Sequence, residues 1–333
     1  MTQVEGELRQ PAAAARPPVY LSAIGTALGA PCAARDLQLG GRETLLATLI
    51  EDGFHTHRRH QGAMDELIAR ALRQALDRWP GAAASIDVIL YASTRISPAD
   101  ADTVSAACRA EGLSEAALIG LGFGGCANLA TAIHVAQALV RAGAYSTVAV
   151  ITADRGSDDD RVAAMDQGVL SDGASACIVA AKPGGPESFE ILGTATRGHQ
   201  GLREIDFMAR RPHFLMTTAK AVRGATRAAL SQAGVEVGDI EGFITANIQR
   251  TSVQFYGDIC RIAPERWFPD SKADLGHSFG TDLLENLRRA RQNPHRRGPW
   301  LVLAVSPYLW GALVITPLQA LDARERCSTD RLG

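Results

Sequence analysis

The sequence predicts an α/β fold, because stretches typical of helices and of strands alternate along the chain. Apolar residues recur at helical spacing over Met64 to Trp79, and a strand is expected directly afterwards at Ile86 to Ser93. After a glycine-rich segment we expect a helix from about Cys126 to Arg141, and then strands at Thr147 to Ala153 and Ala174 to Ala180. This alternation is typical of a parallel or mixed sheet covered by helices.

The second half of the chain repeats the same order, which indicates an internal duplication. The stretch SIDVILYAS in the first half is similar to DIEGFITAN in the second, and SACIVA is similar to WGALVIT. The expected elements of the second half are a helix at Thr217 to Ala233, a strand at Glu241 to Ala246, a helix from about His277 to Arg291, and strands at Trp300 to Val305 and Gly311 to Thr316.

The composition is that of a globular protein and argues against several functional classes. The 333 residues are 46% hydrophobic and 21% charged, and their net charge of -2 offers no basic surplus for nucleic acid or an anionic membrane. The longest apolar stretch, Trp300 to Thr316, is interrupted by Ser306 and Pro307 and is too short to span a bilayer. Residues 1–18 are expected to form a disordered leader. With no secretory signal in view, the expected compartment is the cytoplasm.

Cys126 follows a run of glycines and begins a strongly apolar helix. Gly122, Gly124 and Gly125 precede it, and glycine lets the backbone turn sharply and approach a ligand closely. The following helix is apolar on almost every side, which indicates that it is buried. A cysteine at a helix N-terminus lies at the positive end of the helix dipole, which favours the thiolate. Cys126 is therefore the candidate nucleophile, and the alternative is a small residue in a tight turn.

The duplication places a histidine at the position that corresponds to Cys126. Cys126 lies 39 residues after Asp87 (126 − 87), and His277 lies 36 residues after Glu241 (277 − 241). If the two halves pack about a pseudo-twofold axis, the two helix starts converge on one cleft. A thiol beside an imidazole is the minimum set for covalent acyl transfer. The alternative for His277 is an imidazole that caps a helix in the core.

Three segments in order resemble the β-ketoacyl-ACP synthase III family of the thiolase superfamily, and the resemblance extends from about Val19 to Thr316. GGCANLATAIHVAQALVRAG is similar to the family's nucleophile segment, GVLSDGASACIVA to its Gly-Asp-Gly-Ala segment and LWGALVIT to its Trp-Gly strand. The resemblance implies a thiolase fold with two duplicated α/β halves, at 19–182 and 183–333, in a five-layered αβαβα arrangement. It also implies that acyl-CoA or an acyl-phosphopantetheine thioester is the substrate and that no cofactor is bound permanently.

Two motifs depart from the family pattern in a way that bears on the reaction. Where the family has the histidine of Pro-His-Gln-Ala-Asn, this chain has Ala246, and where the family has the asparagine of Gly-Asn-Thr-Ser, it has His277. Decarboxylative condensation needs two donors on the malonyl thioester oxygen. His277 supplies one, and Asn247 supplies a second only if its loop turns inward. Transacylation needs a thiolate and a base, so the relocated histidine, expected to be neutral, favours transacylation.

Position in the family pattern also assigns supporting groups. The backbone N–H groups of Cys126 and Ser306 would form the oxyanion hole, although the neighbouring Pro307 donates no N–H. The family's Arg-Thr motif is not recognisable in this chain, but Arg58 and Arg59 are candidates for contacts with the phosphates of coenzyme A or of a carrier-protein arm. The alternative for these two arginines is an ordinary solvated loop. Three histidines lie close to these arginines in FHTHRRH, but no cysteine or carboxylate completes a familiar ligand set, so no metal site is predicted.

The leading hypothesis is an acyltransferase of specialised metabolism. It would take an acyl group from acyl-CoA or an acyl carrier protein onto Cys126 and pass it to a hydroxyl, amine or thiol. The alternatives are a decarboxylative Claisen-condensing enzyme that uses a malonyl thioester, and an inactive partner subunit of a heterodimer. The retention of both Cys126 and His277 argues against the inactive subunit. Family members are dimers, so a homodimer is expected, with neither nucleic acid nor a membrane as partner.

Overall fold

A computed structural model describes residues 17–157, 161–207, 209–293 and 295–319 of the chain. The predicted leader, residues 1–18, lies outside the described residues except for its last two. The elements of the first half are β1 (Tyr20–Leu28), β2 (Ala30–Ala33), α1 (Glu43–Glu51), β3 (Thr56–Arg59), α2 (Met64–Arg78), β4 (Val88–Ala92), α3 (Pro98–Ala110), β5 (Ala117–Leu121), α4 (Asn128–Arg141), β6 (Thr147–Asp154) and β7 (Gly173–Ala180). Those of the second half are β8 (Phe189–Gly198), α5 (Arg211–Ala233), β9 (Gly242–Thr245), α6 (Arg250–Cys260), α7 (Lys272–Leu275), α8 (Gly280–Ala290), β10 (Trp300–Val305) and β11 (Leu309–Pro317).

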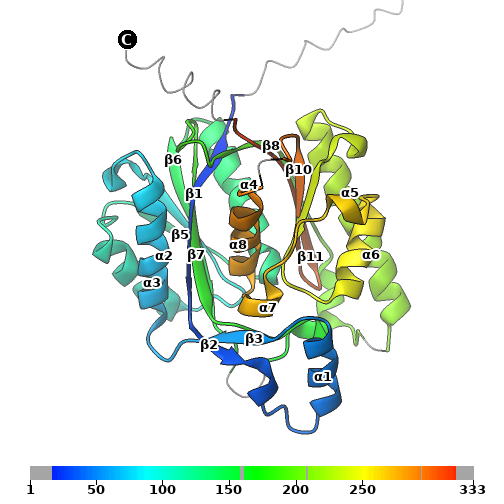
Figure 1. Ribbon diagram of the computed structural model, residues 1–333. Helices are drawn as coiled ribbons and strands as arrows, with labels where there is room; N and C mark the ends of the chain where they lie inside the picture. The colour runs from blue at the N-terminus through cyan, green and yellow to red at the C-terminus, as the bar shows by residue number, and fades with distance from the viewer. Residues whose placement is uncertain (1–16, 158–160, 208, 294, 320–333) are drawn as a thin grey trace, which may run out of the picture.

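The helices and strands lie in five layers, as the family resemblance implies (Figure 1). Helices α2 and α3 cover one outer face, α5 and α6 cover the other, and α4 and α8 lie in the centre between two half-sheets. The strands hydrogen-bond in the order β5-β4-β6-β7-β1-β8-β11-β10-β9, so β1 and β8 join the two half-sheets.

The pairing of the strands repeats between the halves. In the first half β1 pairs with β7 and β7 with β6 in antiparallel fashion, while β6 pairs with β4 in parallel. In the second half β8 pairs with β11 and β11 with β10 in antiparallel fashion, while β10 pairs with β9 in parallel. This common pattern is what a duplicated α/β unit requires, and α4 and α8 occupy corresponding places in the two units.

Three apolar clusters fill the spaces between the layers. The central cluster joins α4 and α8 to both half-sheets, with Ile133, Leu284 and Val302 among its buried members. A second cluster holds α2 and α3 against the first half-sheet, and a third holds α5 and α6 against the second. The largely apolar character of α4 follows from this central position, because a helix between two sheets has little surface toward water.

Helix α3 and strand β5 were not predicted from the sequence, and both form within the stretch described above only as glycine-rich. Helix α3 begins with a capping box, in which the Asp100 carboxylate accepts the backbone N–H of Ser97 and the Ser97 side chain accepts the backbone N–H of Asp100. Pro98 occupies the first turn. Its buried stripe is short, with Val104, Ala107 and Cys108 as its buried members. So narrow an apolar stripe gives little periodic signal in the sequence.

In the described part of the chain, no helix combines the length and apolar composition needed to cross a membrane.

Close packing of α4 against β11 depends on a glycine. A Cβ at Gly311 would lie 2.3 Å from the Cβ of Ala130, a separation that real atoms do not reach. We therefore expect Gly311→Ala to lower the free energy of unfolding by about 1–3 kcal/mol through overpacking. Urea denaturation measures this change, and Gly238→Ala is the matched control because nothing lies within 4 Å of a Cβ there. Equal stability of both variants would contradict this packing.

Candidate active site

The nucleophile candidate lies in a short helical turn directly before α4. Gly125 has a φ of +58°, in the left-handed region that favours glycine, and a Cβ there would lie 3.0 Å from the Cβ of Ser306. A Cβ at Gly124 would lie 2.1 Å from Oδ1 of Asn128. Close contacts therefore favour glycine at positions 124 and 125, whereas a Cβ at Gly122 would meet only an ordinary contact at 3.4 Å. Cys126 is partly exposed.

The structure brings His277 into contact with Cys126, as the duplication predicts. The Sγ of Cys126 and the Nε2 of His277 are 3.3 Å apart, although 151 residues separate them in the chain. His277 is buried and precedes α8, whose first residue is Gly280 rather than the predicted His277. Its backbone is fixed by two hydrogen bonds with the segment before β7: its N–H donates to Val169 and its carbonyl accepts from Ser171.

The carboxylate of Asp282, which was not predicted from the sequence, is hydrogen-bonded to the imidazole nitrogen that faces away from Cys126. Oδ2 of Asp282, in the first turn of α8, is 2.7 Å from Nδ1 of His277. The same oxygen accepts the backbone N–H groups of Asn247 and Ser278, at 3.2 and 3.1 Å. Asp282 is fully buried. A carboxylate at Nδ1 sets the tautomer and orientation of the ring, so that Nε2 faces the sulfur.

The environment of His277 favours its charged form. Burial lowers the pKa of His277, but the Asp282 carboxylate and the Cys126 sulfur, both hydrogen-bonded to the ring, raise it well above its ordinary value. The expectation that His277 stays neutral is thus corrected, because its surroundings favour the imidazolium. The resulting row of sulfur, imidazole and carboxylate matches the arrangement of cysteine and serine acyl-transfer triads.

A second buried carboxyl is electrostatically coupled to this site. Asp154, at the end of β6, accepts hydrogen bonds from the N–H of Thr94 (2.7 Å) and the hydroxyl of Ser93 (2.9 Å). Burial raises the pKa of Asp154 to about 7, while these hydrogen bonds and the charge of His277 lower it. The carbonyl of Ser93 accepts the side-chain amide of Asn128, two residues after Cys126. Asp154 therefore supports the loop beneath the nucleophile.

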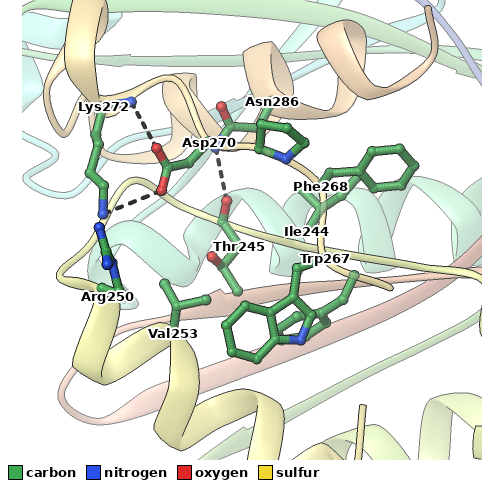
Figure 2. A pocket seen from close by; sticks show the side chains of 11 residues that line it. Ile244, Thr245, Arg250, Val253, Trp267, Phe268, Asp270, Lys272 and Asn286 are labelled. Atoms are coloured by element: carbon green, nitrogen blue, oxygen red, sulfur yellow. Dashed lines mark hydrogen bonds and ion pairs between the residues drawn. The ribbon is translucent and has the colours of Figure 1, made fainter. Parts of the chain in front are cut away.

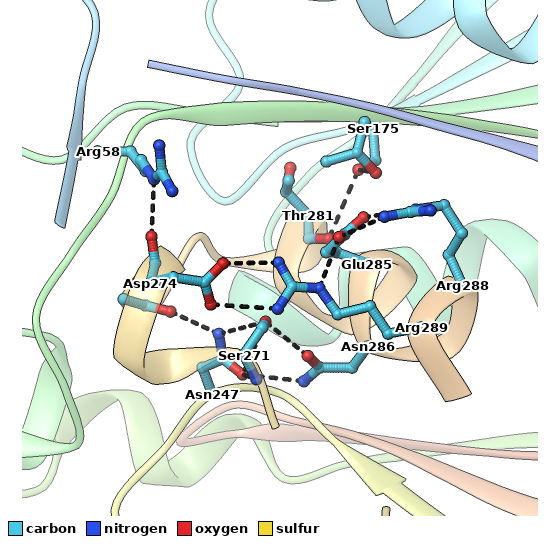
Figure 3. A network of polar contacts seen from close by, with 12 residues as sticks. Arg58, Ser175, Asn247, Ser271, Asp274, Thr281, Glu285, Asn286, Arg288 and Arg289 are labelled. Atoms are coloured by element: carbon cyan, nitrogen blue, oxygen red, sulfur yellow. Dashed lines mark hydrogen bonds and ion pairs between the residues drawn. The ribbon is translucent and has the colours of Figure 1, made fainter. Parts of the chain in front are cut away.

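The structure corrects the expected role of Asn247. Its two amide hydrogens are donated to Oγ of Ser271 (3.0 Å) and to the carbonyl of Gly276 (2.6 Å), and Asn286 donates to its Oδ1 (Figure 3). No hydrogen of this fully buried amide remains for a thioester oxygen. Asn247 instead ties the loop after β9 to α7 and α8, and its backbone N–H supports Asp282.

Ser306 is also corrected as a backbone donor of the oxyanion hole. Its N–H is already donated to the carbonyl of Leu309, at 2.9 Å. Its Oγ accepts the N–H groups of Leu309 and Tyr308, at 3.0 and 3.4 Å. Pro307 has no N–H to donate, and the other backbone N–H groups of this turn are bonded within the turn. None of them is left for a thioester oxygen.

The two arginines that were candidates for phosphate contacts lie on β3. Nε of Arg58 donates to the carbonyl of Asp274, at 2.8 Å, which joins β3 to α7 (Figure 3). Arg59 is exposed. In the same segment, His57 is buried, and burial and the charge of Arg161 lower its pKa. No group of three or more His, Cys, Asp or Glu side chains suited to a metal occurs within the described residues.

A pocket of about 300 Å³ lies beside the carboxyl end of β9 (Figure 2). Its lining combines the aromatic side chains of Trp267 and Phe268 with a Lys272–Asp270 ion pair, in which Nζ and Oδ2 are 3.3 Å apart. Neither the sulfur nor the imidazole of the candidate pair lines it, so this pocket is separate from the reaction centre.

Comparison with known proteins finds a family match over the nucleophile segment and a shared fold over most of the chain. Residues 124–199 match the family model described as 3-Oxoacyl-[acyl-carrier-protein (ACP)] synthase III, which confirms the predicted resemblance over the nucleophile segment and β7. A comparison with curated proteins finds no match. The thiolase fold, by contrast, is shared with many solved structures.

Three of these structures illustrate the likeness. The acyltransferase ChlB3 is 19% identical, with a TM-score of 0.77 over 91% of this chain and 98% of its own. The 3-oxoacyl-[acyl-carrier-protein] synthase III from Aquifex aeolicus is 16% identical, with a TM-score of 0.71 over 90% and 99%. Cerulenin-bound OleA from Xanthomonas campestri is 13% identical, with a TM-score of 0.71 over 90% and 96%. At these identities the likeness establishes the fold.

The pairing of Asp282 with His277 predicts how the reactivity of the cysteine depends on pH. In Asp282→Asn the pKa of His277 falls, because the carboxylate no longer raises it. The imidazolium, which would stabilise a thiolate at Cys126 if one forms, is then lost at lower pH. An ordinary thiol with a pKa of about 8.5 is only about 1% thiolate at pH 6.5. We therefore expect alkylation of Cys126 by iodoacetamide at pH 6.5 to slow by up to about 100-fold.

The rate of alkylation as a function of pH, followed by intact mass, checks this prediction. Glu285→Gln is the matched control, since this acid lies on the same helix but pairs with Arg288 and Arg289. An Asp282→Asn profile that coincides with that of the unaltered protein would show that the carboxylate does not tune the pair.

Proposed function

We propose that the protein is an acyltransferase that takes an acyl group from an acyl-CoA or acyl-carrier-protein thioester onto Cys126. The group then passes to a hydroxyl, amine or thiol acceptor, in a pathway of specialised metabolism. The observation that carries the proposal is the row formed by Cys126, His277 and Asp282, in which the sulfur and Nε2 are 3.3 Å apart and Nδ1 and the carboxylate are 2.7 Å apart.

The charge state of this row suits both half-reactions. In the first, the Cys126 thiolate attacks the thioester carbonyl carbon, and His277 gives its proton to the departing thiol. The imidazole is then neutral, and Nε2 faces the place where an acceptor must approach. In the second, His277 removes a proton from the acceptor as it attacks the acyl-enzyme, while Asp282 stabilises the returning imidazolium.

Transfer is favoured over decarboxylative condensation by the supply of hydrogen-bond donors. Condensation develops an enolate on a malonyl thioester, and a missing donor for such an oxyanion costs on the order of 10²–10³ in rate. Ala246 stands at the position of the family's histidine and is buried with no polar side chain to offer. The amide of Asn247, the other candidate donor, is already fully used. The resemblance in fold to ChlB3, described as an acyltransferase, agrees with transfer.

The decisive experiment is intact-mass analysis after incubation with a panel of acyl-CoA and acyl-carrier thioesters. We expect a mass increase equal to one acyl group, absent in Cys126→Ala. In His277→Ala, turnover with an added amine or alcohol should fall by about 10²–10⁴, the usual contribution of a general acid–base residue. A chain that acquires no acyl group from any thioester, with its fold intact by circular dichroism, would defeat the proposal.

Condensation is tested separately with a malonyl-carrier thioester added to the acyl-enzyme. We expect no release of carbon dioxide above the rate seen with Cys126→Ala. Release that depends on both Cys126 and His277, together with a 3-oxoacyl product, would replace transfer by condensation as the function.

We also propose that the protein is a homodimer joined through β5. This strand is an edge of the sheet, with β4 as its neighbour, and it leaves Ile119 40% exposed, with Phe123 80% exposed just beyond its end. An unpaired edge with apolar side chains is a surface that a second strand can complete. The opposite edge, β9, is covered, since Phe268 donates its N–H to the carbonyl of Phe243. Antiparallel pairing of β5 with its copy would continue the sheet across the dimer.

Ile119→Lys tests this interface, because a charge on an edge strand opposes pairing. Light scattering after size-exclusion chromatography should give a dimer for the unaltered protein and a monomer for Ile119→Lys. Met216→Lys is the control, since Met216 is a 71% exposed apolar residue on the opposite outer layer, in α5, and its replacement should leave the dimer intact. A monomeric unaltered protein, or a dimeric Ile119→Lys variant, would contradict the proposed interface.

A further inference from the structure

We propose that the phenol of Tyr308 is the second donor of the oxyanion hole and acts beside the backbone N–H of Cys126. The inference rests on the proposed function, because it concerns the carbonyl oxygen of the thioester that Cys126 attacks. A tyrosine hydroxyl would here perform the task that the sequence analysis gave to a backbone N–H of the loop before β11.

The loop itself offers no backbone donor for this task. The N–H of Ser306 is bonded to the carbonyl of Leu309 at 2.9 Å, and Pro307 has none. The N–H groups of Tyr308 and Leu309 are both directed to Oγ of Ser306, at 3.4 and 3.0 Å. Every backbone donor of this four-residue turn is therefore absent or already used. An oxyanion hole needs preorganised donors, so the second one must come from a side chain.

The hydroxyl of Tyr308 lies close to the residue that precedes the nucleophile. A Cβ at Gly125, the residue directly before Cys126, would lie 3.5 Å from the Tyr308 hydroxyl oxygen. This hydroxyl has no hydrogen-bond partner among the described residues, whereas the hydroxyl of Tyr91 donates to a backbone carbonyl. Cys126 is the second residue of its helical turn, where the N–H lacks an acceptor within the helix. The two candidate donors come from different halves of the chain and lie at neighbouring positions, because Gly125 and Cys126 are adjacent.

A cation holds the Tyr308 ring in place. The guanidinium carbon of Arg203 lies 3.6 Å from the centroid of the ring, within the range of a cation–π contact. Arg203 is itself fixed, because Nε donates to the side-chain oxygen of Gln200 at 2.7 Å and a terminal nitrogen donates to the carbonyl of Phe123. Phe123 directly precedes Gly124 and Gly125, so the arginine connects the tyrosine to the nucleophile segment. A donor held in this way needs no reorganisation when charge develops.

The step assigned to Tyr308 involves no transfer of its proton. The Cys126 thiolate forms a bond to the thioester carbon, and the π electrons of the carbonyl move to its oxygen. The Tyr308 O–H and the Cys126 N–H donate hydrogen bonds to that oxyanion. When the carbonyl re-forms, the carbon–sulfur bond to the donor thiol breaks, and the departing thiolate takes the proton from His277.

Tyr308→Phe tests the proposal, because it removes the donor and keeps the ring beneath Arg203. We expect the rate of acyl-enzyme formation, measured by quenched-flow and intact mass with an acyl-CoA, to fall by about 10²–10³. Alkylation of Cys126 by iodoacetamide forms no oxyanion, so its rate should stay within about twofold of that of the unaltered protein. Tyr256→Phe, the same change at a buried tyrosine of α6, is the control and should affect neither rate.

Two results would overturn the inference. One is acylation of Tyr308→Phe at the rate of the unaltered protein, and the other is an equal loss of acylation and alkylation, which would assign the hydroxyl a structural role. Failure of the unaltered protein to accept any acyl group would instead count against the proposed function, so the two failures are distinguishable.

A fluorinated tyrosine at position 308 gives a second measurement that preserves the size of the side chain. Ring fluorines lower the pH at which a phenol ionises, and a phenolate cannot donate a hydrogen bond. Acylation by this variant should therefore decline as the pH rises through the ionisation of the fluorophenol, while alkylation does not. A pH profile of acylation identical to that of the unaltered protein would contradict donation by Tyr308.

Discussion

The hydrogen bond between Asp282 and His277 is the interaction on which the rest of the site depends. A buried imidazole alone would be neutral, and the adjacent cysteine would then behave as an ordinary thiol. The 2.7 Å contact with a fully buried carboxylate reverses this balance and keeps the ring charged. The carboxylate is in turn held by two backbone N–H groups, from Asn247 and Ser278, which belong to different loops. The folding of those loops therefore helps to set the protonation of His277.

The fold and the central pair of the site could be predicted from the sequence, because both produce a repeated pattern. Two halves with the same order of elements require corresponding helices at the centre, and that correspondence placed Cys126 beside His277. Asp282 escaped notice because it lies five residues beyond His277, in the first turn of a helix whose start was placed too early. An acid at that position looks like an ordinary helix-capping charge until the packing of α8 shows that it faces inward.

The errors in the supporting groups have a different cause. Asn247 and Ser306 were chosen for position, and each is a polar residue near the correct loop. The side-chain amide of Asn247 donates to the carbonyl of Gly276, which is distant in the sequence. The N–H of Ser306 donates to the carbonyl of Leu309 within the turn that contains Pro307. Which donors remain free is a property of the whole hydrogen-bond network, and a linear motif does not contain that information.

The matched pairing of the two half-sheets has a consequence for how such a site can arise. In an assembly of two identical chains related by an exact twofold axis, both chains must place the same residue beside the axis. Such an assembly offers two sulfurs or two imidazoles, and never one of each. Cys126 and His277 occupy corresponding places in the two halves and yet differ. When both halves belong to one polypeptide, their sequences can differ. A cysteine and a histidine can therefore meet at the centre of a pseudo-twofold protein.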